Sequence, residues 1–306
     1  MQHLISIHDL DQDQIREIFD LAADLKARQH RGEEHRLLAG KTLAMIFEKP
    51  STRTRVSFET GMAQLGGHPL VLNAGDTQLG RGETIHDTAK VLGRYVDGIM
   101  ARTFAHETVL DLAKYGSVPV INGLTDLLHP CQGLADYFTI QERFPDLGDV
   151  TVSYVGDGNN VTHSLLYGAA KLGCDIRVAT PPGYEPIADV IATAKRDAEA
   201  TGATISLTHD PKEAVDGVQV IYTDTWTSMG QEDEAKQRRK DLAGFQVNQA
   251  MLGAAAPEAI VMHCLPAHRG EEITDEVMDG PQAAVWDEAE NRLHVQKAIM
   301  VLLMRD

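Results

Sequence analysis

The sequence predicts an α/β protein with two doubly wound domains, each built on a mainly parallel sheet that helices flank. Short apolar runs of strand type alternate with segments of helical periodicity along nearly the whole chain, a pattern typical of parallel sheets. The 306 residues also exceed the size at which a single hydrophobic core is usual. A second series of strands and helices opens at Thr151, which favours two domains.

The expected elements follow from apolar runs and their spacing. Residues 43–47 form the first strand-like run. Phe58, Met62 and Leu65 follow at the spacing of one helix face, and Gly66-Gly67 ends that helix. The charged stretch 224–241 is expected to be a long loop between elements. The expected strands are 43–47, 69–72, 98–102, 118–121, 150–155, 175–179, 204–208, 218–222 and 260–263, and helical patterns lie at 84–95, 106–115, 132–143, 160–172, 186–200 and 288–304.

Composition excludes several classes of protein. Hydrophobic residues make up 43% and charged residues 24% of the chain, as in globular proteins that dissolve in water. No apolar run reaches the roughly 18 residues of a membrane span, and Met1-Gln2-His3-Leu4 does not open a secretion signal. Three cysteines, Cys131, Cys174 and Cys264, fit a reducing cytoplasm. A formal net charge of −17 argues against nucleic acid as a partner. We therefore expect a cytoplasmic protein that binds neither membrane nor nucleic acid.

The segment Ser51-Thr52-Arg53-Thr54-Arg55 predicts an anion site. It lies between the first strand and the helix that follows, so Ser51 is expected to be the N-cap. The hydroxyl and N–H groups of residues 51–54 then surround a helix N-terminus, which carries partial positive charge. Arg53 and Arg55 add fork-shaped donors suited to phosphate oxygens. Because the net negative charge of the chain repels an anionic ligand, such a ligand needs several cations at its binding site, and this segment supplies two.

Polar residues follow several other predicted strands at their carboxyl ends, where ligands of open α/β sheets bind. Any one of them taken alone could be a turn or cap residue. Their recurrence at the same end of so many strands predicts a common site. The residues are Arg102, His129-Pro130-Cys131-Gln132, Asp157-Gly158-Asn159-Asn160, Asp224 and His263-Cys264-Leu265-Pro266.

Three other chemistries fit these residues less well. Gly156-x-Gly158 follows a strand but lacks the third glycine and the ribose-binding acid of a dinucleotide site. His129, Cys131 and the pair His263-Cys264 are zinc-ligand types without C-x₂-C spacing. The chain also contains no G-x-S-x-G nucleophile elbow. We therefore expect no metal and no cofactor.

Taken in order, these motifs resemble the aspartate/ornithine carbamoyltransferase family, the transcarbamylases, over about residues 40–300. The segments Phe47 to Glu59 and His129 to Gln132 are shared by both branches of that family. Asp224-x-x-x-Ser228-Met229-Gly230 and His263-Cys264-Leu265-Pro266 resemble the ornithine branch. An aspartate-type chain would be expected to carry a Pro-Leu-Pro turn and no Ser-Met-Gly.

The resemblance implies how the chain is organised. Residues 1–133, together with a C-terminal helix 288–306 that packs back on them, would bind carbamoyl phosphate, and residues 134–287 would bind ornithine. The resemblance also implies a homotrimer with active sites shared between subunits. Gln78 lies in the loop that resembles the segment lent by a neighbouring subunit. Some relatives carry a lysine near Gly82, and here Arg81 would supply that cation.

The reaction that the resemblance implies transfers the carbamoyl group of carbamoyl phosphate to the δ-amino group of L-ornithine. The products are L-citrulline and phosphate, and the step belongs to arginine biosynthesis or a urea-cycle type of pathway. The implied catalytic residues are Arg102, His129, Gln132, Asp224, Cys264 and Arg292. The implied carbamoyl-phosphate-binding residues are Ser51, Thr52, Arg53, Thr54, Gln78, Arg102, His129, Gln132, Cys264, Leu265 and Arg292. The implied ornithine-binding residues are Asn160, with Asn159 beside it, Asp224, Ser228 and Met229.

Two alternatives stay open. The acceptor could be another amine, such as putrescine, N-acetylornithine or aspartate, although Asp224 with Ser228-Met229 favours free ornithine. The chain could also be a non-catalytic binding paralogue. The second alternative is disfavoured, because a binding module has no use for groups that polarise a carbonyl. The residues that argue against it are Arg53, Arg102, His129 and Gln132.

Overall fold

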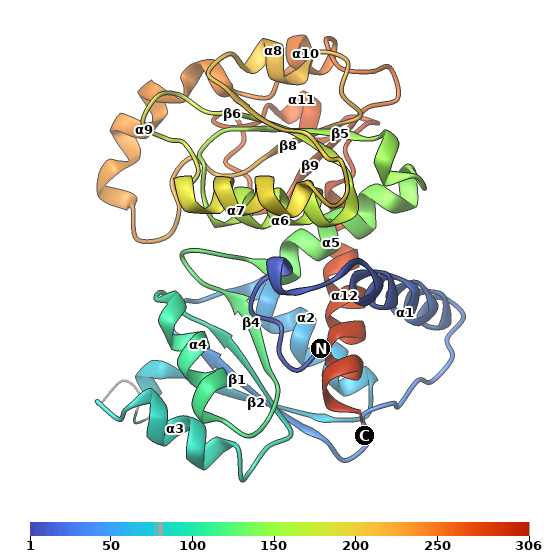
Figure 1. Ribbon diagram of the computed structural model, residues 1–306, viewed down its shortest axis with the longest axis vertical. Helices are drawn as coiled ribbons and strands as arrows, with labels where there is room; N and C mark the ends of the chain where they lie inside the picture. The colour runs from blue at the N-terminus through green and yellow to red at the C-terminus, as the bar shows by residue number, and fades with distance from the viewer. Residues whose placement is uncertain (77, 79–81, 306) are drawn as a thin grey trace. The chain divides into compact units, whose positions relative to one another are not determined.

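The computed structural model describes residues 1–76, 78 and 82–305. The chain divides into two compact units, Met1–Ala135 with Asn291–Asp306, and Asp136–Glu290. Each unit contains one sheet, and the paired strands of both sheets run parallel (Figure 1). The predicted α/β class, with two parallel sheets flanked by helices, is confirmed. Among the described residues, no helix is long and apolar enough to cross a membrane.

The first unit holds a four-stranded sheet in the order β2-β1-β3-β4. Side chains alternate along a strand, so Ala44 and Ile46 of β1 pack into a core with α3 and α4, and Leu43 and Met45 face the opposite side. The helices α1, α2 and α12 lie together on that opposite side (Figure 1). The elements are α1 (Gln12–His30), β1 (Thr42–Phe47), α2 (Thr52–Gln64), β2 (His68–Asn73), α3 (Ile85–Leu92), β3 (Gly98–Arg102), α4 (His106–Tyr115), β4 (Val120–Leu124) and α12 (Val285–Met304).

The second unit holds a five-stranded sheet in the order β7-β6-β5-β8-β9. Val155, Ile221 and Val261 contribute to a core on one of its faces, with residues of α8, α10 and α11. Helices α6 and α7 contact each other and pack against strands of the sheet. The elements are α5 (Pro130–Arg143), which begins in the first unit, β5 (Thr151–Val155), α6 (Asn160–Leu172), β6 (Asp175–Ala179), α7 (Ala188–Ala198), β7 (Ile205–Thr208), α8 (Pro211–Val215), β8 (Val220–Thr223), α9 (Ala235–Asp241), α10 (Gln249–Leu252), β9 (Ile260–His263) and α11 (Asp275–Met278).

Each sheet contains a point where the strand order changes direction. In the first unit β2 lies on one side of β1 and β3 on the other, and in the second unit β6 and β8 flank β5 in the same way. The loops leaving such neighbouring strands diverge and open a crevice at the carboxyl ends, which is where α/β proteins bind ligands. Ser51 follows β1 and Arg102 is the last residue of β3, and Asn159 and Asp224 follow β5 and β8. The fold therefore brings the predicted polar residues to two such points, one in each unit.

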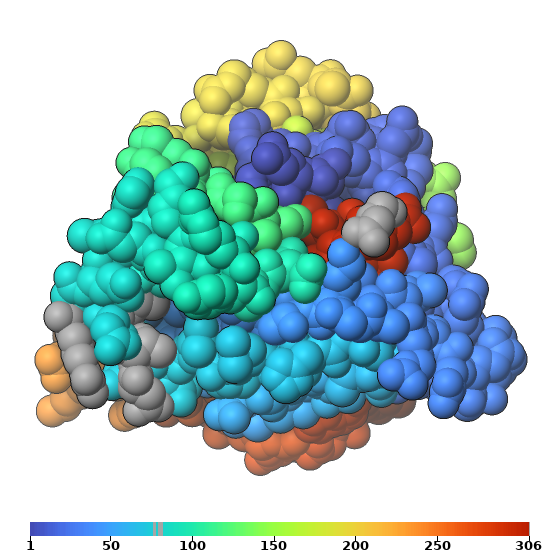
Figure 2. Space-filling model, turned by 90° about the horizontal axis from the view of Figure 1, so that it is seen from below, coloured from blue at the N-terminus to red at the C-terminus, as the bar shows by residue number. Residues whose placement is uncertain are grey.

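Helix α12 from Asn291 onward belongs to the first unit, although the whole second unit precedes this part in sequence. It approaches α2 so closely at Gly61 that a Cβ there would lie 3.1 Å from the Lys297 Cγ and from the Met300 Cε. Arg305 pairs with Glu17 of α1 at 3.3 Å. Figure 2 shows the red residues of this C-terminal region between the dark blue N-terminal segment and lighter blue residues. The expected helix 288–304 is thus present and begins three residues earlier, at Val285.

Among the segments that differ from expectation, two have a clear physical reason. The fourth strand spans Val120–Leu124 instead of 118–121, because buried Asn122 continues it and donates from its amide to the Ile5 carbonyl. Residues 224–241 were expected to be a long loop, but the structure forms a short 3₁₀ helix, Glu232–Glu234, and then α9. Helix α9 has the sequence Ala-Lys-Gln-Arg-Arg-Lys-Asp, which lacks the apolar spacing by which helices are found, since Arg238 is its only buried residue.

Candidate active site

The N-terminus of α2 has the geometry of an anion site. Ser51 is the N-cap, as predicted, and its side chain accepts a hydrogen bond from the Thr54 N–H at 3.2 Å. The first turn of α2 therefore directs N–H groups and the dipole's positive end toward the loop after β1. Arg53 is half-buried and Thr52 is exposed at this turn. A cavity beside it is lined by residues that include Pro50, Ser51, Thr52, Arg55 and Asn73.

Lys49 is a cation of this region that sequence reasoning did not single out. Its side chain is buried, forms an ion pair with Asp126 and lies over the Phe104 ring, 4.3 Å from the centroid. It also lines the cavity beside Ser51. The only sequence signal is its place two residues before the N-cap, and a lysine at such a position is usually a surface residue.

Three arginines of the first unit lie close enough to His129 for their charges to act on it. His129 is the residue before α5 and is 5% exposed. Burial lowers the pKa of this imidazole well below its ordinary value, and the charges of Arg292, Arg102 and Arg53 lower it further. At neutral pH the ring is therefore uncharged, and it can donate a hydrogen bond from one nitrogen. The net charge of −17 repels an anion from the protein as a whole. The three arginines supply the local positive charge that an anion needs in order to bind near His129.

Arg292 connects α12 to both the helix N-terminus and α5. It is 5% exposed and donates from Nη1 to the Gln132 side-chain oxygen. Its Nη2 lies 3.4 Å from the Thr54 Oγ1. The first unit thus brings together the predicted Arg292, Gln132 and Thr54. Gln78 is described as exposed, with its carbonyl accepting from the Glu83 N–H at 3.1 Å, and the predicted role of Arg81 lies outside the described residues.

In the second unit, three donors orient the Asp224 carboxylate. Its Oδ2 accepts from the Asn159 side-chain amide at 2.7 Å, and its Oδ1 accepts from the Thr225 N–H at 2.7 Å and the Cys264 thiol at 3.0 Å. Asp224 is 4% exposed. Because these bonds fix both oxygens, the carboxylate is held ready for a cationic ligand without needing to reorganise.

Asn159 has two roles, one structural and one in the site. Its Oδ1 caps α6 by accepting from the Val161 N–H at 3.0 Å and the Thr162 N–H at 3.2 Å. Its amide nitrogen then reaches Asp224. Asn160, the residue predicted for ornithine, is the first residue of α6 and half-buried. The cap thus places Asn159 against the carboxylate, and Asn160 follows it at the start of α6.

Cys264 carries a protonated thiol. Burial raises the pKa of the Cys264 thiol well above its ordinary value, and the negative charges of Asp224 and Glu288 raise it further. The S–H therefore donates to Asp224 instead of acting as a thiolate nucleophile.

The turn after Cys264 is held by His263. Leu265 has φ of 60°, an uncommon backbone conformation for a large side chain, and its N–H donates to the His263 Nδ1 at 2.9 Å. The other ring nitrogen of His263 contacts the Glu272 carboxylate at 3.1 Å. Asp224, His263 and Cys264 have ligand-type atoms within 4.8 Å of one another. Since both His263 nitrogens are engaged, this trio in its present conformation has no free imidazole for a metal.

Ser228 and Met229 lie in a segment that Arg238 holds in place. The Ser228 N–H donates to the Gln231 side chain at 3.1 Å, and Met229 is exposed. Arg238 pairs with buried Asp157 at 3.0 Å and donates to the Trp226 carbonyl at 3.2 Å. Burial raises the pKa of Asp157 to about 6, against the opposing effect of the Arg238 charge. The conformation of the predicted substrate loop therefore depends on an ion pair at its base.

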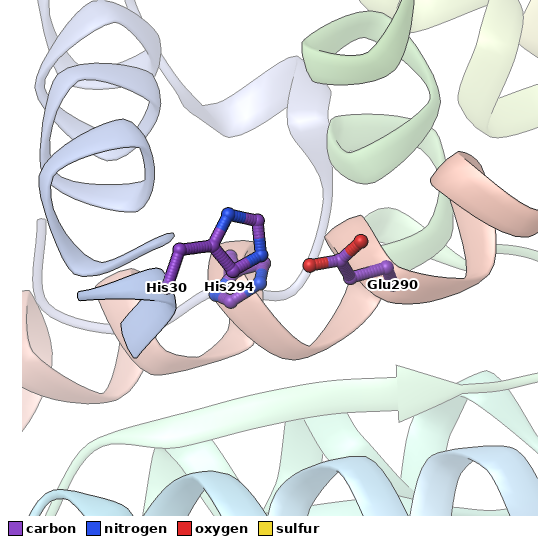
Figure 3. Close-up of side chains that lie close together, drawn as sticks. All are labelled: His30, Glu290 and His294. Atoms are coloured by element: carbon purple, nitrogen blue, oxygen red, sulfur yellow. The ribbon is translucent and has the colours of Figure 1, made fainter. Parts of the chain in front are cut away.

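One histidine pair lies outside these clusters. The rings of His30, at the end of α1, and His294, on α12, make an edge contact with centroids 6.1 Å apart, and Glu290 precedes His294 by about one helical turn (Figure 3). The contact packs α1 against α12.

Fold and sites together define a two-domain α/β protein with an arginine-rich anion site in one unit and an oriented carboxylate in the other. Family models match both parts: the carbamoyl-P binding domain of the aspartate/ornithine carbamoyltransferases over residues 2–142, and their Asp/Orn binding domain over residues 148–303. The chain belongs to the aspartate/ornithine carbamoyltransferase family.

Several relatives are similar over nearly their full length. A protein of Pyrococcus abyssi named ornithine carbamoyltransferase is 60% identical over 301 residues, covering 98% of this chain and 95% of the relative. One of Pyrococcus furiosus named "Ornithine carbamoyltransferase, anabolic" is 58% identical, covering 98% of this chain and 96% of the relative. A solved structure of ornithine carbamoyltransferase from Pyrococcus furiosus matches with a TM-score of 0.96 and 58% identity, covering 99% of this chain and 97% of that one.

Proposed function

We propose that this protein is an ornithine carbamoyltransferase, which transfers the carbamoyl group of carbamoyl phosphate to the δ-amino group of L-ornithine and releases L-citrulline and phosphate. The observation that carries the proposal is the uncharged His129 among Arg53, Arg102 and Arg292 in the first unit. A phosphate needs the arginines, and a carbonyl that becomes an oxyanion needs a neutral donor close to them. The names of the similar proteins support the same activity.

In this proposal residues 1–133 and 288–306 bind carbamoyl phosphate, and residues 134–287 bind ornithine. The phosphate binds at the N-terminus of α2, where N–H groups, hydroxyls and arginines converge. The residues assigned to carbamoyl phosphate are Ser51, Thr52, Arg53, Thr54, Gln78, Arg102, His129, Gln132, Cys264, Leu265 and Arg292.

The carbonyl end is assigned to Arg102, His129 and Gln132. Arg102 bridges a phosphate oxygen and the carbonyl oxygen, and His129 donates to the carbonyl oxygen as the tetrahedral intermediate forms. The Gln132 side-chain oxygen already accepts from Arg292, and its second lone pair accepts from the carbamoyl NH₂. Removing the His129 donor is expected to lower kcat by roughly 10²–10³-fold, the usual cost of losing one oxyanion donor.

The nucleophile is the δ-amino group of ornithine, assigned to Asp224 and Cys264, with Asn160, Ser228 and Met229 holding the amino-acid end. An alkyl amine titrates near ~10.4, so only about one part in 10³ is unprotonated near pH 7.4. Asp224 orients this amine but also stabilises its ammonium form, and the departing phosphate accepts the proton. Turnover is therefore expected to rise above pH 7, and a rate that fell steadily from pH 6 to 9 would contradict the assignment.

Residues 224–241 are proposed to close over the second substrate and to exclude water that would hydrolyse carbamoyl phosphate. Carbamoyl phosphate then binds first. Isothermal titration with each substrate alone and then in sequence tests the order. Tight binding of ornithine to the protein without carbamoyl phosphate would overturn it.

The protein is proposed to act in the cytoplasm as a homotrimer in which Gln78 reaches the site of a neighbouring subunit. Sedimentation of the 33.5 kDa chain measures the oligomeric state. Mixing two impaired variants, Gln78→Ala and His129→Ala, after dissociation and reassembly tests the sharing of sites. Hybrid trimers regain activity if one chain supplies Gln78 and another supplies His129, and mixtures that stay as inactive as their parents count against shared sites.

The activity is tested by measuring citrulline formation from carbamoyl phosphate and L-ornithine, with L-aspartate, putrescine and N-acetylornithine in parallel. A strong preference for ornithine is the expected result. Turnover with another acceptor would keep the chemistry of the first unit and overturn the roles of Asp224, Ser228 and Met229. Binding of carbamoyl phosphate without turnover of any amine would favour a non-catalytic paralogue.

A further inference from the structure

Arg292 is a buried cation whose hydrogen-bond partners in the first unit carry no charge. Its Nη1 donates to the Gln132 amide oxygen and its Nη2 lies within reach of the Thr54 hydroxyl. Among the described residues, no carboxylate pairs with it. An arginine buried in this way keeps its full positive charge for a ligand. The two bonds hold the Nη end of its guanidinium group and leave the Nε edge to another partner.

Gln296 is that partner, one turn further along α12. With its amide oriented as its neighbours require, its oxygen accepts from the Arg292 Nε at 3.1 Å and from the Arg292 Nη2 at 3.0 Å. These two donors lie on one edge of the guanidinium, so a single oxygen between them fixes both the position and the plane of the group. Gln296 is fully buried, so water does not replace these bonds.

Ser57 continues the network to the anion site. The Gln296 amide nitrogen donates to the Ser57 Oγ, and the Ser57 hydroxyl donates to the Thr54 carbonyl at 3.2 Å. The hydrogen bonds thus form a chain in which each group donates to the next, from Arg292 to Gln296, from Gln296 to Ser57 and from Ser57 to the first turn of α2. Two uncharged side chains, Gln296 and Ser57, therefore fix the position of Arg292 relative to helix α2, whose N-terminus forms the anion site.

We propose that Gln296 is a positioning residue for Arg292, acting through the guanidinium and not on the substrate. The inference rests on the proposed function, in which Arg292 contacts carbamoyl phosphate. An amide suits the role because it accepts two hydrogen bonds without neutralising the arginine. A carboxylate at residue 296 would orient Arg292 equally well but would cancel the charge that the anion needs.

The test is a double-mutant cycle with Gln296→Met, Arg292→Met and the double variant, read as kcat/KM for carbamoyl phosphate. Methionine keeps the unbranched length and helix propensity of glutamine but offers no comparable acceptor. Losing a buried bond to a charged group typically costs 10- to 100-fold, and this is the expected drop for Gln296→Met. In the Arg292→Met background the same change is expected to lower kcat/KM by less than about 2-fold, because residues that act through one another are not additive.

Lys297→Met is the matched control for damage to the helix. Lys297 is the next residue of α12, is also fully buried, and donates to Gln29, Gln64 and His35, but it does not contact Arg292. The Lys297→Met variant removes three buried hydrogen bonds from the same helix, and it is expected to leave kcat/KM for carbamoyl phosphate within about 2-fold of wild type.

Equal losses from Gln296→Met in both backgrounds would overturn the inference, because they would show an effect on the fold. The inference would also be overturned if Gln296→Met kept the wild-type kcat/KM while Arg292→Met was strongly impaired. That result would leave the proposed function intact. Wild-type kcat/KM for Arg292→Met would instead contradict the role of Arg292 itself, and the inference with it.

Discussion

The contact between Cys264 and Asp224 determines what the thiol can do. The carboxylate accepts from the S–H at 3.0 Å, and burial together with the charges of Asp224 and Glu288 keeps the pKa of the thiol well above its usual range. The thiol therefore stabilises one orientation of the carboxylate. It does so without the oxidation and alkylation chemistry of an exposed thiolate.

Asp224→Asn is expected to make Cys264 more reactive, since it removes both the negative charge and the charged acceptor. Labelling by iodoacetamide at pH 8, followed by mass spectrometry, should be slow in the wild type and faster by about 10-fold or more in the variant. Cys131 and Cys174 are internal references, because burial raises the pKa of each to about 12. The variant Asp189→Asn, at an exposed position of α7, controls for the loss of one charge. Rapid labelling of wild-type Cys264 would contradict this account.

At the scale of elements, the conformation of the segment 224–241 depends on the contacts of Arg238, near its C-terminal end. Arg238 joins α9 to Asp157 after β5 and to the Trp226 carbonyl, and its guanidinium lies 5.2 Å from the centroid of the Tyr184 ring. At the other end of the segment Ser228 is half-buried and Met229 is exposed, and neither has a comparable buried ion pair among the described residues. Movement of this segment is therefore expected at the substrate end, with Arg238 as the fixed end.

Arg238→Met is expected to raise KM for ornithine about 10-fold and to leave KM for carbamoyl phosphate unchanged. Breaking a buried ion pair leaves Asp157 unpaired, at a typical cost of about 3–5 kcal/mol in stability. The neighbouring Arg239→Met is the matched control, because Arg239 pairs with Glu271 on the surface at 3.0 Å with a side chain 55% exposed. Steady-state kinetics with each substrate varied in turn measures the effect. Similar KM values for ornithine in both variants would count against a role for the Arg238 anchor.

The elements that the sequence predicted well are those whose signal is local. Strands β1 and β3 carry nearly unbroken apolar runs and β6 alternates polar with apolar residues before Val178-Ala179, and their observed bounds differ from the expected ones by one residue at most. Helix α1 was not predicted, although Asp11 and Gln14 form a capping box at its start. Asn122 interrupts the apolar run of β4 because it serves a tertiary contact with Ile5.

The residues of the site divide in the same way, into those with a local sequence signal and those whose role depends on distant partners. Ser51 and Asn159 cap helices directly after strands, so their positions follow from turn and cap chemistry along a few residues. Lys49, Ser57 and Gln296 matter because of side chains far away in sequence, and a single chain carries no local sign of those partners. Arg292 was predicted from the family resemblance alone. That prediction required the order of several motifs along the chain, because no single motif near Arg292 indicates its role.

At the scale of the first unit as a whole, Lys297 ties three helices together, and no carboxylate of the described residues pairs with it. Its ammonium donates to Gln29 of α1 at 2.7 Å, Gln64 of α2 at 3.0 Å and His35 at 3.2 Å, and burial lowers its pKa from 10.5 to about 8. Below pH 8 the lysine is charged in both the folded and the unfolded chain, and the folded chain bears the full cost of burying the charge. Between pH 8 and 10.5 only the unfolded chain keeps the proton, so this cost is progressively removed.

The free energy of unfolding of the wild type, relative to that of Lys297→Met, is therefore expected to rise by about 1–3 kcal/mol from pH 8 to 10.5. Urea denaturation of both proteins at several pH values measures the difference, and it cancels the groups that titrate equally in both. A difference that stays constant over this range, or falls, would contradict the burial of a charged Lys297.

The division of the chain into units also has a consequence for its synthesis. Residues 291–306 complete the first unit, yet they leave the ribosome after residues 136–290. The second unit has its whole sequence available earlier and can fold as a block while the first still lacks one helix. Until that helix arrives, Gly61 and its neighbours on α2 stay uncovered, and the anion site lacks Arg292. On the proposed assignment of Arg292 to carbamoyl phosphate, a nascent chain is expected to bind this ligand only weakly until synthesis has passed both domains, so that tight binding would mark a completed chain.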